Sequence, residues 1–105
     1  MSEYLYVVQM DIPPEREADF NRIYDTQHVP EIMKVPGVLS VKRYKLEKSS
    51  NTGYPTYLAL YACASADVPQ SPAWVKASDT GDWKTMIRPH TTNRMHSLFR
   101  DVSPA

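Results

Sequence analysis

The chain has 105 residues, a length that suits a single domain over residues 1–105 with one modest hydrophobic core. Hydrophobic residues make up 42% of it and charged residues 23%, which are ordinary values for a globular protein. Twelve basic side chains balance twelve acidic ones, and this argues against binding to nucleic-acid phosphates or to an anionic membrane surface.

The first half of the chain predicts a strand followed by helical segments. Residues 3–12 are rich in β-branched and aromatic types and predict a strand. Pro13-Pro14 ends this strand and opens a helix, because proline is well tolerated in a first helical turn. Pro30 interrupts the helical pattern, so we expect the first helix to end near His28 and a second short helix to cover 30–35.

The second half predicts three more strands and little helix. Residues 38–48 predict a strand with many charges, and residues 55–64 an almost continuous apolar strand, typical of burial on both faces. We expect at most a short helix over 73–77, a further turn over 82–88 and a last charged strand over 91–102.

This β-α-β-β-α-β order predicts a ferredoxin-like α+β fold with a four-stranded antiparallel sheet in the order 4-1-3-2. The apolar first and third strands suit central positions, and the charged second and fourth strands suit edges. Two helices cover only one face of such a sheet, so the far face of the third strand needs another cover. We therefore expect a homodimer in which two sheets form a dimeric α/β barrel, with a pocket between each sheet and its helices.

The candidate catalytic residues lie in the segment from Asn21 to Tyr44. Tyr24 and His28 are four residues apart and would point from the same side of one helix. Asp25 lies three residues before His28 and could hydrogen-bond to its imidazole. A helix that starts at Pro30 would place its positive end at His28 and keep the ring uncharged, as a general base requires. In the structural alternative, His28 caps a helix and Tyr24 packs on the sheet.

Five side chains on the strands are candidates for contact with a ligand. Gln9 is a polar residue in a central strand, on the face opposite Tyr6, and a buried amide needs a partner or a cavity. The Gln9 face is therefore the favoured pocket side. Tyr6 and Tyr61 would offer hydroxyls to a phenol, lactone or enol if they faced the pocket, although packing explains them too. Arg43, beside Tyr44, could bind a carboxylate, but charge on an edge strand also accounts for it.

Metals and nucleotide cofactors are not expected. His90 and His96 are six residues apart with no carboxylate cluster beside them, so both are interpreted as exposed histidines. With only three glycines, the sequence contains no glycine-rich phosphate-binding loop. The single cysteine, Cys63, excludes a disulfide framework and indicates a buried thiol in a reducing compartment. With no secretory signal and no apolar run long enough to span a bilayer, we expect a cytoplasmic protein.

The central segment resembles a known family. Residues 23–31 read Ile-Tyr-Asp-Thr-Gln-His-Val-Pro-Glu, residues 35–38 read Val-Pro-Gly-Val, and an Arg-Tyr pair follows. This is similar to the EthD-like branch of the dimeric α/β-barrel superfamily, in which many members read WYDEEHLPE followed by VPGF. The likeness covers roughly residues 4–46 by motif. It implies a homodimer with a pocket between sheet and helices, and a histidine at or near that pocket.

Related branches of the superfamily include cofactor-free monooxygenases, muconolactone isomerases, polyketide cyclases and haem-degrading enzymes. We therefore expect a small cofactor-independent enzyme that performs acid/base chemistry of the isomerase, cyclase or lyase type on an apolar, oxygen-bearing metabolite. In this hypothesis His28 is the acid or base, Asp25 orients it, and Tyr24 donates a hydrogen bond to the developing oxyanion. The alternatives are a non-catalytic ligand-binding or accessory dimer of a degradation pathway, and a cofactor-free or haem-type monooxygenase.

Overall fold

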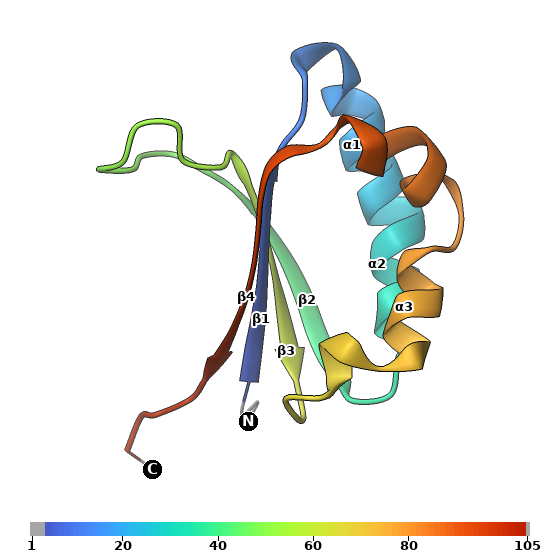
Figure 1. Ribbon diagram of the computed structural model, residues 1–105, viewed down its shortest axis with the longest axis vertical. Coiled ribbons are helices and arrows are strands. Elements are labelled where there is room, and N and C mark those ends of the chain that lie inside the picture. Colours follow the sequence, from blue (N-terminus) through green and yellow to red (C-terminus); the bar gives the residue numbers. More distant parts are fainter. Residues whose placement is uncertain (1–3, 105) are drawn as a thin grey trace.

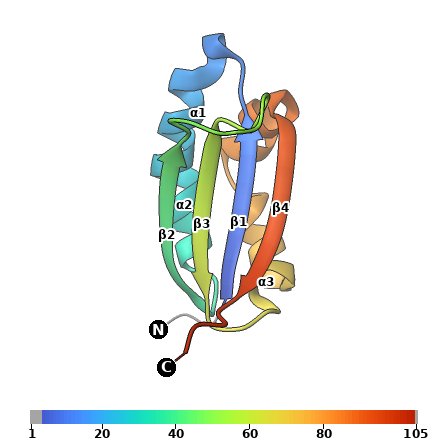
Figure 2. The same ribbon diagram turned by 90° about the vertical axis from the view of Figure 1, so that its left-hand side faces the viewer.

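The sheet has the predicted topology. The computed structural model describes residues 4–104 and shows one antiparallel sheet with its helices on a single face (Figure 1). Its strands are β1 (Tyr4–Asp11), β2 (Val38–Lys45), β3 (Tyr57–Cys63) and β4 (Thr92–Arg100). They lie in the order β2-β3-β1-β4 (Figure 2), which is 4-1-3-2 read from the opposite edge. The prediction of a ferredoxin-like α+β fold is confirmed.

The helical layer consists of short segments. Its α-helices are α1 (Glu17–Ile23), α2 (Val29–Met33) and α3 (Pro72–Ser78). Short 3-10 turns cover Pro14–Arg16, Val68–Gln70 and Arg88–His90, and wider π turns cover Tyr24–His28 and Trp83–Ile87. Ser71 is the N-cap of α3, and its hydroxyl accepts a hydrogen bond from the Trp74 N–H, as expected of a capping serine.

The prediction that Pro30 separates two helices is wrong. The chain stays helical from α1 into α2 through the π turn Tyr24–His28, and Val29 has φ −60° and ψ −48°. The Val29 N–H donates to the Tyr24 carbonyl, five residues back instead of four. In a regular α-helix the ring of a proline clashes with the carbonyl four residues earlier. The wider turn just before Pro30 therefore lets the helix continue.

The core fills the space between the helices and one face of the sheet. Its largest fully buried side chains are Phe20, Ile23, Ile32, Tyr61, Cys63 and Ile87. Trp74 and Trp83 are buried there too, and they anchor the second half of the helical layer to the sheet. Because β-strand side chains alternate between faces, Val8 and Met10 of β1 point into this core, while their neighbours point away.

The far face of the sheet carries apolar side chains that no segment within residues 4–104 covers fully. They are Leu5, Val7, Leu58, Leu60, Met95 and Phe99. The loop between β2 and β3 projects on that side of the sheet (Figure 1). Phe99, on the edge strand β4, is 56% exposed.

Candidate functional site

His28 lies in the π turn and points into the core, where it is only 5% exposed. Its ring stacks on Trp83, with centroids 4.5 Å apart and planes 26° apart, and meets the Tyr24 ring edge-on at 5.0 Å. The Nδ1 atom is buried and has no hydrogen-bond partner among the described residues. Burial, followed by the charges of Arg88 and Arg43, lowers the pKa of His28 to about 4. The ring is therefore neutral at neutral pH.

Two predicted features of His28 are wrong. The helical chain runs unbroken through His28 into α2, so no free helix end lies at the ring, and burial is the largest cause of its neutral state. Asp25 does not orient the imidazole either, because its carboxylate accepts a 2.7 Å hydrogen bond from Arg43 Nη1 instead. The Asp25 side chain is 62% exposed, on the outer side of the helix.

The predicted tyrosines line the same interior space and largely fill it. The hydroxyls of Tyr24 and Tyr61 hydrogen-bond to each other at 2.6 Å. Burial raises the pKa of Tyr24 to about 12 and that of Tyr61 well above its ordinary value. Tyr6 lies beside Tyr61 with ring centroids 6.2 Å apart. Tyr24 and Trp83 occupy the space next to His28, so the predicted pocket around His28 is filled by side chains.

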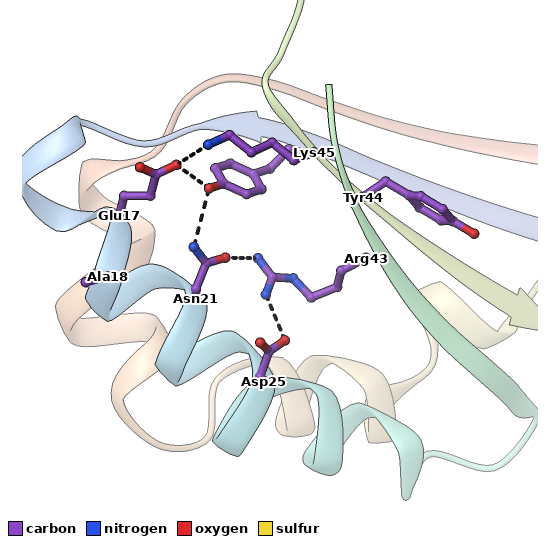
Figure 3. Close-up of a pocket in the computed structure, with 8 residues that line it drawn as sticks. Glu17, Ala18, Asn21, Asp25, Arg43, Tyr44 and Lys45 are labelled. Carbon is purple, nitrogen blue, oxygen red and sulfur yellow. Dashed lines mark hydrogen bonds and ion pairs between the residues drawn. The ribbon is translucent and has the colours of Figure 1, made fainter. Parts of the chain in front are cut away.

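An open groove of about 650 Å³ lies on the same side of the sheet, between α1 and the edge strand β2 (Figure 3). It is lined by Glu17, Ala18, Asn21, Asp25, Arg43, Tyr44, Lys45 and Tyr57. A much smaller void of about 10 Å³ lies deeper, bounded in part by Phe20, Tyr24 and Arg43, and holds at most a single water. The groove, unlike this void, is therefore large enough for a small molecule to enter.

One end of the groove is built around the Tyr57 hydroxyl. It donates a short hydrogen bond to Glu17 Oε2, and Asn21 Nδ2 donates to the Tyr57 oxygen at 3.3 Å. Lys45 Nζ donates to the same Glu17 oxygen at 3.1 Å. The Tyr57 hydrogen bond, followed by the Lys45 hydrogen bond and charge, lowers the pKa of Glu17, and the Glu17 hydrogen bond raises the pKa of Lys45. Both side chains therefore carry their charges at neutral pH.

The other end of the groove is built around Arg43. Its Nη2 donates to Asn21 Oδ1 at 2.8 Å and its Nη1 to Asp25 at 2.7 Å, as Figure 3 shows. The guanidinium carbon lies 4.3 Å from the centre of the Tyr24 ring. Arg43 therefore connects the open groove with the buried tyrosine pair. Although it belongs to an edge strand, its side chain is only 16% exposed, so edge charge alone does not account for it.

Two of the predicted ligand contacts do not face the helices. Gln9 lies on the far face of the sheet, where its Nε2 donates to the Tyr54 hydroxyl at 2.9 Å. The expectation that the pocket lies on the Gln9 face is wrong, because the helices cover the opposite face. Gln9 and Tyr44 line a separate hollow of about 280 Å³ beneath the β2–β3 loop. In Figure 3 the Tyr44 ring points away from the other groove residues.

The remaining predicted features involve metals and membranes. His90 lies in a 3-10 turn, and His96 lies on β4 beside the Tyr6 ring, with centroids 6.2 Å apart. Among residues 4–104, no group of three or more histidine, cysteine or acidic side chains is placed to hold a metal ion. No helix in that range has both the length and the apolar composition needed to cross a bilayer.

Sequence reasoning missed the polar groove residues Glu17, Asn21 and Lys45, although their spacing carries a signal. Glu17, Asn21 and Asp25 recur every four residues, which places them on one face of a helix. Arg43 and Lys45 are two residues apart and share one face of a strand. Both spacings are visible in the sequence, but the sequence does not show that this helix face packs against this strand face.

The chain matches one protein-family model and shares its fold with several solved structures. A family model described as "Domain of unknown function (DUF4286)" matches residues 3–101. No curated protein sequence matches the chain. Among solved structures, an EthD family protein from Bacillus halodurans aligns with a TM-score of 0.65 at 13% identity, over 93% of this chain and 98% of its own.

Two further solved structures share the fold. The heme-degrader MhuD from Mycobacterium tuberculosis, with two hemes bound in its active site, aligns with a TM-score of 0.67 at 15% identity, over 97% of this chain and 98% of its own. SnoaB from Streptomyces nogalater, a cofactor-independent oxygenase, aligns with a TM-score of 0.66 at 16% identity, over 99% of this chain and 97% of its own. The resemblance to EthD proteins is confirmed at the level of the fold.

Proposed function

Because this chain belongs to the DUF4286 family, whose description assigns no reaction, we propose a function from the chemistry of the groove itself. The protein is a small enzyme that binds an oxygen-bearing molecule between α1 and β2 and performs acid–base chemistry of the isomerase, cyclase or lyase type. The supporting observation is the Tyr57 hydroxyl, which the Glu17 carboxylate and the Asn21 amide hold at the open groove.

The size and charge of the groove support a small ligand. Its volume of about 650 Å³ is in the ordinary range for small-molecule sites. Its two carboxylates are balanced by two cations, Arg43 and Lys45, so negative charge that develops on a ligand would meet fixed positive charge nearby. An oxygenase and a heme-degrading protein have the same fold, which is consistent with a small-molecule site in this chain. A shared fold does not identify the reaction, however.

Glu17 and Tyr57 would perform the proton transfer together. The Glu17 carboxylate takes a proton from a carbon beside the ligand's carbonyl group, and the Tyr57 O–H turns from Glu17 to the developing oxyanion. Because the Tyr57 hydrogen bond is the largest cause of the lowered pKa of Glu17, its loss makes Glu17 a stronger base as the ligand ionises. The proton then returns to another carbon of the same molecule, so an isomerisation consumes neither protons nor electrons.

The catalytic roles that the sequence suggested for His28 and Tyr24 pass to Glu17 and Tyr57 in this proposal. Tyr24 gives its hydroxyl to Tyr61 in the core, and His28 lies against Trp83. A ligand in the groove would reach neither group unless the core rearranged.

Hydrogen exchange in D₂O tests the proposal. A panel of enol lactones and β-dicarbonyl compounds is incubated with the protein, and NMR measures loss of the C–H signal beside the carbonyl. We expect exchange above the uncatalysed rate for at least one compound, reduced about 100-fold in Glu17→Gln and Tyr57→Phe, in keeping with the usual contribution of a general base. Glu15→Gln, two residues earlier and outside the groove, should retain it. No exchange with any compound, or full exchange in Glu17→Gln, would contradict the proposal.

We also propose that two chains pair through the far face of the sheet. This face presents apolar side chains on three adjacent strands, including Leu5, Leu60 and Phe99. Monomeric proteins seldom expose continuous apolar patches of this kind, and pairing two such faces would bury them. The β2–β3 loop projects on the same side and would contact the partner (Figure 1).

Sedimentation tests the pairing. We expect a mass of twice 12.0 kDa for the wild type at micromolar concentration, and a monomer for Phe99→Arg. Val75→Arg is the matched control, because Val75 on α3 is 54% exposed, almost the same as Phe99 at 56%, but lies in the helical layer. A wild-type monomer, or a Phe99→Arg dimer, would overturn the assignment of this face.

A further inference from the structure

We infer that Asp25 occupies the position of a ligand carboxylate on Arg43, so that the groove takes a monocarboxylate and Asp25 competes with it. The inference builds on the proposed ligand groove, but it does not depend on the proton-transfer step at Glu17.

Arg43 is held as a fixed cation. Its guanidinium carbon lies 4.3 Å from the Tyr24 ring centre and 5.2 Å from that of Phe20, so aromatic faces support it on the core side. A guanidinium keeps its charge at any ordinary pH and presents its N–H groups in a rigid planar fork. That fork suits the two oxygens of a carboxylate. Arg43 is thus preorganised for an anionic group that arrives from the groove.

The two present partners of Arg43 differ in how firmly they are held. Asn21 accepts from Nη2 at 2.8 Å and is itself fixed through its amide N–H to Tyr57. Asp25 accepts from Nη1 at 2.7 Å, yet its side chain is 62% exposed and makes no second hydrogen bond within residues 4–104. Asp25 can therefore turn into water at little cost, since an ion pair to an exposed carboxylate is weak. Asp25 is the partner that a ligand would displace.

The charge of the groove specifies one carboxylate on the ligand. Glu17 is already paired with Lys45 and Tyr57 at the other end, so Arg43 is the cation whose partner can be exchanged. A ligand with a single carboxylate would take the place of the Asp25 carboxylate beside Arg43, while Asp25 turns into water. An uncharged ligand of the same shape would leave the Arg43–Asp25 pair in place and gain nothing from this cation.

Equilibrium titration with two probes tests the inference. Benzoate is the monocarboxylate, and benzamide is the uncharged molecule of the same shape. Apparent affinity is proportional to the fraction of Arg43 sites that Asp25 leaves open, so Asp25→Ala should bind benzoate about 2- to 6-fold more tightly than the wild type. Benzamide binding should not change. NMR shift titration of the full-length chain measures both.

Two further variants complete the test. Asp19→Ala is the matched control, because Asp19 lies on the same helix at 53% exposure and pairs with Arg22 outside the groove. It should leave benzoate binding unchanged. Arg43→Lys, with its fold checked by circular dichroism, should lose the preference for benzoate over benzamide. Equal benzoate affinity in Asp25→Ala and the wild type, or equal affinity for both probes in Asp25→Ala, would overturn the inference.

The failures of the two proposals can be told apart. Glu17-dependent hydrogen exchange without the Asp25 effect on benzoate would remove the carboxylate assignment and leave the acid–base function. The expected benzoate effect without any hydrogen exchange would leave Arg43 as a carboxylate-binding residue and remove the proposed reaction.

Discussion

Replacing Tyr24 by phenylalanine removes one hydroxyl of a buried pair and leaves the other without a partner. The Tyr24 and Tyr61 side chains are 2% and 1% exposed, and their hydroxyl oxygens lie 2.6 Å apart. Neither hydroxyl makes another hydrogen bond within the described residues. Water cannot take the place of the lost hydroxyl without a cavity to enter, so the remaining one stays unsatisfied.

The size of the effect follows from this burial. An unsatisfied buried hydroxyl costs about 1–3 kcal/mol, so Tyr24→Phe and Tyr61→Phe should each lower the free energy of unfolding by that amount. The double variant leaves no orphan hydroxyl and should lose only about 1 kcal/mol, the net contribution of one hydrogen bond. The two single losses together should therefore exceed the loss in the double variant by about 1–5 kcal/mol.

Urea unfolding of the four proteins measures this cycle. Trp83 packs against Tyr24 with ring centroids 4.9 Å apart, so its fluorescence reports on the same part of the core. Protein concentration must be the same throughout, because the stability of a dimer depends on it. Tyr44→Phe, whose ring is half exposed, should change the free energy by less than about 0.5 kcal/mol. Additive losses for Tyr24 and Tyr61 would refute a coupled hydroxyl pair.

Two other predictions concern pH and a tight turn. The pKa of His28 is about 4 in the fold and ordinarily 6.5, so the stability that its neutral ring contributes is complete above pH 6.5 and is lost as the pH falls toward 4. Urea unfolding at pH 7 and pH 4 should show an extra loss of about 3 kcal/mol in the wild type compared with His28→Phe, and equal losses would contradict this. Gly81 and Gly53 both have φ +74°, so alanine is equally strained at either position. A Cβ on Gly81 would also lie 2.7 Å from Gln27 Oε1, whereas a Cβ on Gly53 would have no atom within 4 Å. Gln27 Oε1 cannot move away freely, because it accepts a 2.9 Å hydrogen bond from the Asp82 N–H. Thermal unfolding should show that Gly81→Ala costs about 1–2 kcal/mol more than Gly53→Ala, and equal costs would exclude the Gln27 contact as the cause.

The sequence determined the architecture, because its signals are local. Runs of β-branched, aromatic and apolar residues identified the strands, and the proline and glycine positions identified their ends. The apolar first and third strands are central and the charged second and fourth lie at the edges. The failure at Pro30 has a local cause as well: a π turn is not visible as a residue pattern, although it changes the hydrogen-bond partner by a single residue.

The candidate site was decided by tertiary structure. Alternation along β1 places Tyr6 and Gln9 on opposite faces, but only the packed helices decide which face becomes the interior. Asp25 is three residues from His28 in sequence, yet its partner is Arg43, eighteen residues away. A hydrogen bond needs atoms within about 3 Å, and that approach depends on how α1 docks against β2. Side-chain spacing along the chain sets which residues share a face, whereas the partner across the groove is set by the docking of the whole helix.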